Sequence, residues 1–205
     1  MDLHFFIKGL IIGFSIAAPV GPIGILCIRR TLAEGRMPGF ISGLGAATAD
    51  ALYGCIAGFG LTFIASFLIH QLGWFQPIGG AFLCYLGVRA FLSKPADPLA
   101  SERGKGLGSA YASTFFLTLT NPMTILAFAA IFAGLGVASE SKDYVTAGIL
   151  VMGVFLGSTL WWVILSSGVG LFRKKFDLGA LRWVNRISGT ILMGFGLISL
   201  LGLKR

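Results

Sequence analysis

The chain has few charged residues: only 12% of its 205 residues are Asp, Glu, Lys or Arg, whereas 56% are hydrophobic. Its mean hydropathy of +0.87 lies far above that of soluble domains, so the lipid bilayer is the expected solvent and partner for most of the chain. A soluble interaction module is excluded. The net charge of +8 does not indicate a nucleic-acid partner, because the basic residues lie between apolar runs, where they meet lipid headgroups.

Histidine and cysteine are also scarce, with two and three residues in the chain. Cys27, Cys55 and Cys84 show no CxxC spacing, and His4 and His70 stand alone. Neither a disulfide framework nor a metal site is predicted, and no cofactor is expected. No histidine accompanies a candidate nucleophile, so the chain is not predicted to be an enzyme.

Long apolar runs dominate what remains, and six of them could each cross a hydrocarbon core of about 30 Å. They are Phe5–Ile28, Phe40–Leu68, Leu72–Leu92, Ala110–Leu135, Val145–Phe172 and Val184–Leu203. The longest polar interval, which contains prolines and glycines, follows the third run and is typical of a linker. We therefore expect a first three-helix repeat over 1–92, a polar cytoplasmic linker over 93–109 and a second three-helix repeat over 110–205.

The two halves resemble each other weakly, and the matches occur in the same order along the chain. They pair Pro22–Leu26 with Pro122–Leu126, Asp50–Tyr53 with Ser158–Trp161, Gly80 with Gly189, and Gly87 with Gly196. Because each half has an odd number of spans, the second must cross the membrane in the opposite sense. The predicted fold class is an all-α integral membrane protein with six transmembrane helices, arranged as two inverted three-helix repeats with broken first helices.

The basic residues predict the orientation of these spans. Twelve of the 16 Lys and Arg residues follow spans one, three and five, beginning with Arg29, Arg30 and Arg36. Because cytoplasmic loops carry an excess of Lys and Arg, those loops are expected inside and both termini outside.

The first break is predicted at Ala18-Pro19-Val20-Gly21-Pro22, inside the first apolar run. A proline removes a backbone donor and clashes with the carbonyl four residues earlier, so Pro19 and Pro22 free the carbonyls of Ser15 and Ala18. Freed backbone groups at membrane depth need protein or trapped water beside them, which favours a polar pocket. A simple proline kink without function is the alternative.

Asp50 is the only acid well inside a predicted span, roughly 15 Å along the second helix. A carboxylate near mid-bilayer costs at least ~2.5 kcal/mol and normally faces an ion or substrate route. Its helix face is made of small residues and one tyrosine: Gly43, Ala46, Ala47, Tyr53, Gly54 and Ala57. Asp50 is therefore the candidate coupling residue, the alternative being a structural hydrogen bond to a backbone group freed at Pro19 or Pro22.

The second break is predicted at Asn121-Pro122, with Thr118 and Thr120 beside it. These neutral side chains could bind a zwitterion or cap the broken helix end. A helix that resumes after Pro22 would present its first amide groups to a substrate carboxylate. Three aromatic residues, Tyr53, Trp161 and Trp162, are candidates for the pocket wall. The GxxxG pairs, such as Gly9 with Gly13 and Gly153 with Gly157, predict close helix packing within the monomer.

Pro19–Gly60, with its Gly-Pro pair, the turn Arg29–Arg36 and the aspartate at position 50, resembles the LysE/RhtB amino-acid exporter family, and Asn121-Pro122 resembles the second signature of that family. The resemblance implies proton-driven export of amino acids or related small metabolites across the bacterial cytoplasmic (inner) membrane, often by an oligomer. It gives functional weight to Gly21, Pro22, Asp50, Asn121 and Pro122. One departure is Met123, where many members carry a basic residue, so cationic, neutral and non-amino-acid substrates all stay open.

Two alternative functions share this helical plan. A membrane thiol-redox carrier would need paired intramembrane cysteines, but the fourth span has no counterpart of Cys27. A metal-ion exporter would need more His, Cys or acidic residues inside the membrane.

Overall fold

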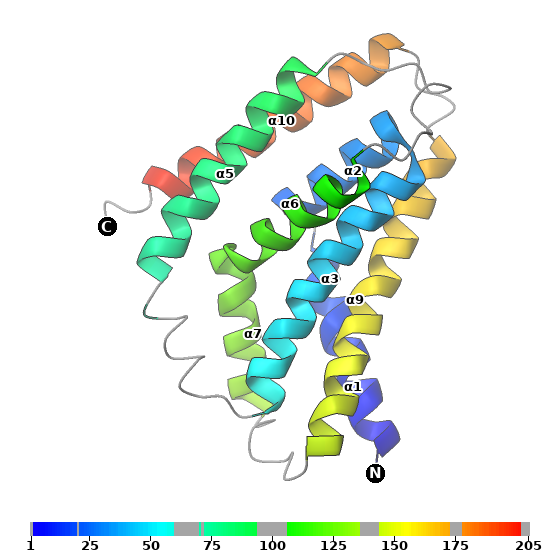
Figure 1. Ribbon diagram of the computed structural model, residues 1–205, viewed down its shortest axis with the longest axis vertical. Coiled ribbons are helices and arrows are strands. Elements are labelled where there is room, and N and C mark those ends of the chain that lie inside the picture. The colour runs from blue at the N-terminus through cyan, green and yellow to red at the C-terminus, as the bar shows by residue number, and fades with distance from the viewer. Residues whose placement is uncertain are drawn as a thin grey trace.

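The computed structural model describes residues 2–19, 21–59, 70, 72–93, 106–135, 144–172 and 178–201, and every regular element in these ranges is an α-helix (Figure 1). The predicted all-α class is therefore confirmed for this part of the chain. In order, the helices are α1 (Asp2–Ala17), α2 (Pro22–Glu34), α3 (Arg36–Gly58), α5 (Leu72–Leu92), α6 (Leu107–Leu119), α7 (Pro122–Leu135), α9 (Tyr144–Phe172) and α10 (Leu178–Leu201).

Two of these helices are long and apolar enough to cross a membrane by themselves, over Tyr144–Phe172 and Gly179–Leu201. Helices α1 and α2 meet the same criteria only as a pair, Leu3–Ala17 with Pro22–Glu34, and they are bent by 79° where they meet. The number of spans supported by length and composition is thus two or three among the described residues.

The helix bounds follow the apolar runs closely in some places and depart from them in others. Helix α5 has the predicted bounds, and α9 begins one residue early. The remainder of the predicted second span, beyond Phe59, falls outside the described residues. The prediction that Arg29 and Arg30 lie in a loop is wrong: α2 continues to Glu34, and both arginines are buried within it. The helix can continue because each guanidinium group finds hydrogen-bond acceptors inside the protein.

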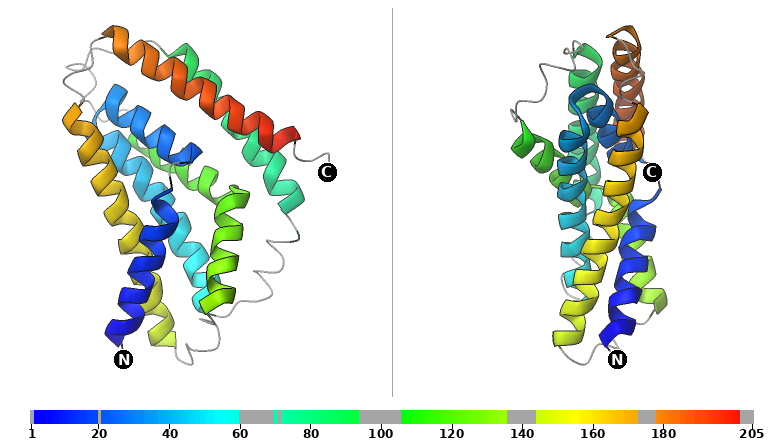
Figure 2. Two further views of the ribbon diagram at one scale, coloured as in Figure 1. Left: turned by 180° about the vertical axis from the view of Figure 1, so that it is seen from behind. Right: turned by 90° about the vertical axis from the view of Figure 1, so that its right-hand side faces the viewer.

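The helices pack in two groups joined by α2. Helix α9 contacts α1 and α3, and α3 contacts α6, whereas α5 and α10 pack against each other (Figures 1 and 2). The contact between α1 and α9 is close because it is made of glycines. A Cβ atom on Gly13 would clash with the carbonyl oxygen of Val154, and one on Gly157 with that of Leu10. The predicted close packing of these GxxxG pairs within the monomer is confirmed.

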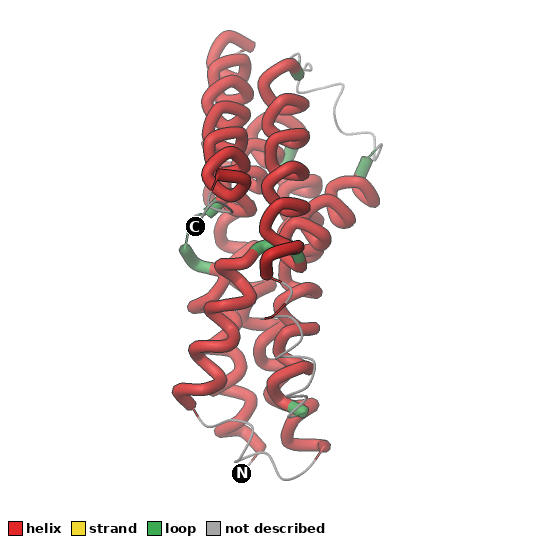
Figure 3. Tube along the Cα trace, turned by 90° about the vertical axis from the view of Figure 1, so that its left-hand side faces the viewer, coloured by secondary structure: helices red, strands yellow, loops and turns green. Residues whose placement is uncertain are grey.

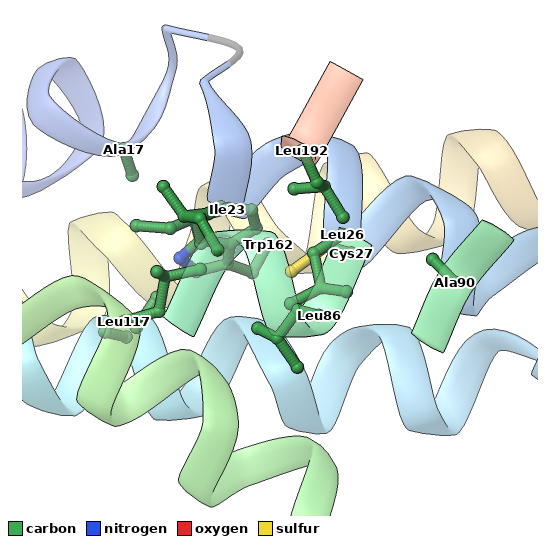
Figure 4. Packing of buried hydrophobic residues seen from close by; sticks show 12 residues of the cluster. Ala17, Ile23, Leu26, Cys27, Leu86, Ala90, Leu117, Trp162 and Leu192 are labelled. Atoms are coloured by element: carbon green, nitrogen blue, oxygen red, sulfur yellow. The ribbon is translucent and has the colours of Figure 1, made fainter. Parts of the chain in front are cut away.

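Helix α2 lies at the centre of the larger apolar core (Figure 4). Leu26 and Cys27 of α2 are almost fully buried, and the cluster around them includes Leu86 of α5, Leu192 of α10 and Trp162 of α9. Burial of a leucine side chain stabilises a water-soluble core by about 1.5–3 kcal/mol, but in lipid the gain comes from close contact instead. This packing fixes α2, and with it the position of the break that precedes it.

Candidate functional site

The first helix break lies between Ala17 and Pro22, where the prolines predicted it. The last helical turn of α1 is closed by Ala18, whose N–H donates to the carbonyl of Phe14 at 2.9 Å. Gly21 precedes α2 in an extended conformation (φ −100°, ψ −164°) and makes no side-chain capping hydrogen bond. Because Pro22 has no N–H, Ile23 and Gly24 carry the first amide donors of α2, which an α-helix leaves without intrahelical acceptors.

The second break lies between Leu119 and Pro122, also where it was predicted, and here side chains of the chain itself bond the backbone. The Oδ1 atom of Asn121 accepts a hydrogen bond from the N–H of Met123 at 3.1 Å, so Asn121 caps the beginning of α7. The hydroxyl of Tyr53, from α3, donates to the carbonyl of Leu119 at 2.7 Å. Figure 3 shows the breaks as short loop segments between helices.

Both breaks border one cavity of about 620 Å³. Six of the seven predicted site residues line it: Pro19, Gly21, Pro22, Asp50, Asn121 and Pro122. Tyr53, the seventh, does not line the cavity: its ring is buried against Phe128, and its hydroxyl is hydrogen-bonded at the second break. The volume lies in the range of pockets that hold small-molecule ligands.

Asp50 forms part of the buried wall of this cavity and is only 3% exposed. Its Oδ2 atom accepts a hydrogen bond from the hydroxyl of Ser158, on α9, at 2.7 Å. Ser158 in turn accepts one from the indole Nε1 of Trp162 at 3.2 Å. The hydrogen bond that the structure gives to Asp50 thus goes to a side chain, and not to a backbone group freed at Pro19 or Pro22. Asp50 is the only ionisable side chain among the described residues that line the cavity.

The remaining walls are mainly apolar. Leu83 of α5, Leu117 of α6 and Phe195 of α10 contribute carbon surface, while Thr118 and Thr124 add hydroxyl groups. Met123 and Ile198 line the cavity although they are 70% and 69% exposed, so they lie at its mouth. Of the two candidate tryptophans, Trp162 lines the cavity. Trp161 instead packs edge-on against Phe14, with ring centroids 5.5 Å apart.

Within the described residues, no group of three or more His, Cys, Asp or Glu side chains could hold a metal ion. Cys27, Cys55 and Cys84 are free thiols. None of the three is among the residues that line the cavity.

A model of the LysE type translocator family matches residues 14–202. The chain belongs to this family. It is 30% identical to the "Putative amino acid efflux protein YcgF" of Bacillus subtilis (strain 168), over 95% of this chain and 94% of the relative. It is also 27% identical to the "Uncharacterized membrane protein YahN" of Escherichia coli (strain K12), over 83% and 77% of the two chains, and 27% identical to the "Uncharacterized membrane protein YrhP" of Bacillus subtilis (strain 168), over 84% and 87%. No solved structure matches the chain. Membership of the LysE type translocators makes the chain a membrane transport protein of the efflux class.

This LysE type translocator also has a polar cluster that the sequence reasoning missed. The Nε atom of Arg29 donates to Oδ1 of Asn185, on α10, at 3.0 Å, and its Nη2 atom donates to the hydroxyl of Ser93 at 2.8 Å. Arg30 turns the other way, toward Ser42 of α3 at 2.7 Å and toward the carbonyl of Ala110 and the hydroxyl of Ser113 in α6. The available signal was the position of two arginines directly after an apolar run, but their partners lie between 12 and 156 residues away.

Proposed function

We propose that the chain is a proton-coupled secondary transporter that exports amino acids or related small metabolites across the bacterial cytoplasmic membrane. The observation that carries this proposal is the joint lining of one cavity by a buried carboxyl group and by both helix breaks. Discontinuous helices beside an intramembrane acid are the usual elements of substrate and ion sites in secondary transporters.

The proposed architecture is six spans in two inverted repeats, 1–92 and 110–205, joined by the linker 93–109. Helices α1 with α2 would be the first span, and α6 with α7 the fourth. Two sets of glycine contacts support this symmetry. A Cβ atom on Gly45 would clash with the carbonyl oxygen of Tyr111 and approach the backbone N atom of Phe115. In the other half, a Cβ atom on Gly153 would clash with the carbonyl oxygen of Phe6 and approach the backbone N atom of Leu10.

In the second set, the glycines that the sequence pairs between the halves contact each other crosswise. Gly80 lies against Gly196, and Gly87 lies against Gly189. Since Gly80 is the predicted counterpart of Gly189, and Gly87 that of Gly196, this crossing is what a two-fold relation between halves requires. The hydrogen bond between Asp50 and its predicted counterpart Ser158 fits the same relation.

The proposed orientation has both termini outside. The C-terminal ends of α2, α5 and α9 lie at one end of the molecule, opposite the N-terminus (Figure 1). Arg36 and Arg89 lie at that end, beside the buried pair Arg29 and Arg30. A concentration of basic residues at one end is the signature of the cytoplasmic side.

In the proposed substrate site, the two helix breaks bind the substrate and Asp50 exchanges the proton. The amide groups of Ile23 and Gly24, at the uncapped beginning of α2, carry partial positive charge toward the cavity and suit a carboxylate. The hydroxyl of Thr118 and the side chain of Asn121 add neutral polar contacts. Asp50 exchanges a proton when the cavity opens to water on either side.

The test is an efflux and resistance measurement in cells that overproduce the protein, with a panel of amino acids and toxic analogues. We expect accelerated efflux of at least one amino acid, abolished by Asp50→Asn at unchanged membrane expression. Glu34→Gln is the matched carboxyl-to-amide control, because Glu34 lies outside the cavity. Full transport by the Asp50→Asn protein would contradict the role of Asp50, and the absence of any effect across the panel would contradict the substrate class.

A further inference from the structure

Among the residues described, one ionisable side chain lines the cavity. The proposed transport cycle requires this cavity to accommodate two positive charges, the proton and the ammonium group of the substrate. Asp50 lines the cavity, while the lining residues from α2, α5, α6, α7, α9 and α10 are uncharged. A substrate ammonium group buried without a counter-charge would be strongly disfavoured, and so would an isolated carboxylate. The proton and the ammonium group therefore have one carboxyl group to share.

Among the residues that the structure describes, no other titratable side chain offers a second site in the cavity. On its own helix the nearest is Tyr53, whose hydroxyl is bonded to Leu119. The helices packed against α3 carry the following titratable or charged side chains among the residues described: Cys27, Arg29, Arg30 and Glu34 on α2, His4 and Lys8 on α1, Tyr111 on α6 and Tyr144 on α9. None of these residues lines the cavity.

The hydrogen bonds around Asp50 are directed toward its carboxylate. The indole of Trp162 can only donate, so it occupies an acceptor position of Ser158, and the hydroxyl hydrogen of Ser158 is then available for Oδ2 of Asp50. One carboxylate oxygen is thus held by a neutral donor from the wall. An ammonium group binding from the cavity would supply the missing charge-assisted bond.

We propose that the proton and the ammonium group of the substrate occupy the Asp50 carboxylate in turn, so that the protein exchanges a proton for an amino acid with an uncharged, apolar side chain. This inference rests on the proposed function. With the cavity open to the cytoplasm, Asp50 releases its proton to water and its carboxylate binds the ammonium group. With the cavity open to the outside, a proton from water takes the carboxylate and the amino acid leaves. Each cycle moves one zwitterion outward and one proton inward, so one positive charge enters.

The apolar walls and the single carboxylate define the side chain of the substrate. Leu83, Phe195 and Ile198 offer carbon surface and no counter-charge. A second ammonium group, as in lysine, would lack a partner, and a second carboxylate, as in glutamate, would add to the negative charge of Asp50. Leucine combines the zwitterion with an uncharged side chain and is the appropriate test compound.

The experiment measures binding of radiolabelled L-leucine to the purified full-length protein, from neutral to mildly acidic pH. We expect the apparent Kd to rise as pH falls, approaching about tenfold per pH unit once the free carboxyl group is mostly protonated, because proton and ligand exclude each other. In a weakly buffered sample at acidic pH, binding should release one proton per leucine. Leucinamide, which keeps the ammonium group, should compete with leucine, and the corresponding 2-hydroxy acid, which lacks it, should not.

The Asp50→Asn protein should lose both the pH dependence and the proton release, whereas Asp50→Glu should retain both. Glu34→Gln should behave as the unmodified protein. Leucine binding that is independent of pH, competition by the hydroxy acid, or no leucine binding at all would each overturn the inference. Transport measurements in reconstituted vesicles distinguish failure of this inference from failure of the proposed function. If a pH gradient drives export of an amino acid but binding releases no proton, the proposed function stands and only the shared use of the Asp50 carboxylate is overturned.

Discussion

The two helix breaks beside the cavity arise from the same proline chemistry but differ in how their backbone groups are satisfied. At the second break Asn121 caps α7, and Tyr53 bonds the carbonyl of Leu119. At the first break Gly21 has no side chain, and α2 begins without a side-chain cap. A proline break therefore creates free backbone groups, but the surrounding side chains decide whether those groups remain available to a ligand.

The largest effect is expected when a substitution adds a side-chain N-cap to α2 at the first break. At Gly21 a Cβ atom would meet nothing within 4 Å, and the extended backbone suits an N-cap residue. In Gly21→Asp the new carboxylate should bind the amide groups of α2 and occupy the place proposed for the substrate carboxylate. We expect export to fall by at least about tenfold, equivalent to about 1.4 kcal/mol, with unchanged or higher thermal stability.

Efflux assays and thermal unfolding of the purified Gly21→Asp protein would measure the two effects together. Gly21→Ala is the matched control and should retain export, since it adds a methyl group without a carboxylate. Normal export by the aspartate variant would show that the beginning of α2 does not face the substrate.

A second test asks whether the halves are alike away from their breaks. Gly45→Ala and Gly153→Ala should destabilise the protein to a similar extent, about 1–3 kcal/mol each, because each Cβ atom would overlap a helix backbone. Gly54→Ala is the control, since its Cβ atom would lie 3.6 Å from Val154, at ordinary contact distance. Thermal unfolding in detergent gives the comparison, and a large difference between the first two variants would argue against equivalent halves.

The bond from Tyr53 supports the second break from outside it. Tyr53→Phe should leave the carbonyl of Leu119 without its donor and cost about 1–3 kcal/mol of stability. Tyr85→Phe, at a 53% exposed position on α5, should change stability by no more than about 0.5 kcal/mol. Equal unfolding temperatures for the two variants would show that the hydroxyl of Tyr53 is dispensable.

The smallest effect is expected at the cap itself. Asn121→Ala should destabilise the protein by about 1 kcal/mol, and Asn121→Ser should recover most of that loss because serine also caps helices well. Export should follow stability in this series if Asn121 acts mainly as a cap. A loss of export in Asn121→Ser at recovered stability would instead indicate direct contact with the substrate.

Local chemistry made the breaks and Asp50 predictable. Proline positions locate both breaks, and an acid among small residues on a hydrophobic helix indicates a buried polar site. The contacts between distant segments were not predictable in this way. Ser158 was matched to Asp50 as its counterpart in the other half, but nothing in a single sequence indicates that counterparts touch.

The helical, buried position of Arg29 and Arg30 was unpredictable for a related reason. Two charged side chains directly after an apolar run are typical of a loop at the membrane surface. Only the packing of α3, α6 and α10 brings Ser42, Ser113 and Asn185 within hydrogen-bonding distance of the two guanidinium groups. Asn185 itself is 1% exposed inside α10, a position that hydropathy alone does not single out.

These adjacent arginines tie α2 to both groups of helices, Arg29 to α10 and Arg30 to α3 and α6. If α5 and α10 separate from α3 and α6, α2 can follow only one group, and the guanidinium bonds to the other group must break. The arginine released by that separation would become hydrated. A solute entering there would then meet a cation that is buried between the helices in the present arrangement.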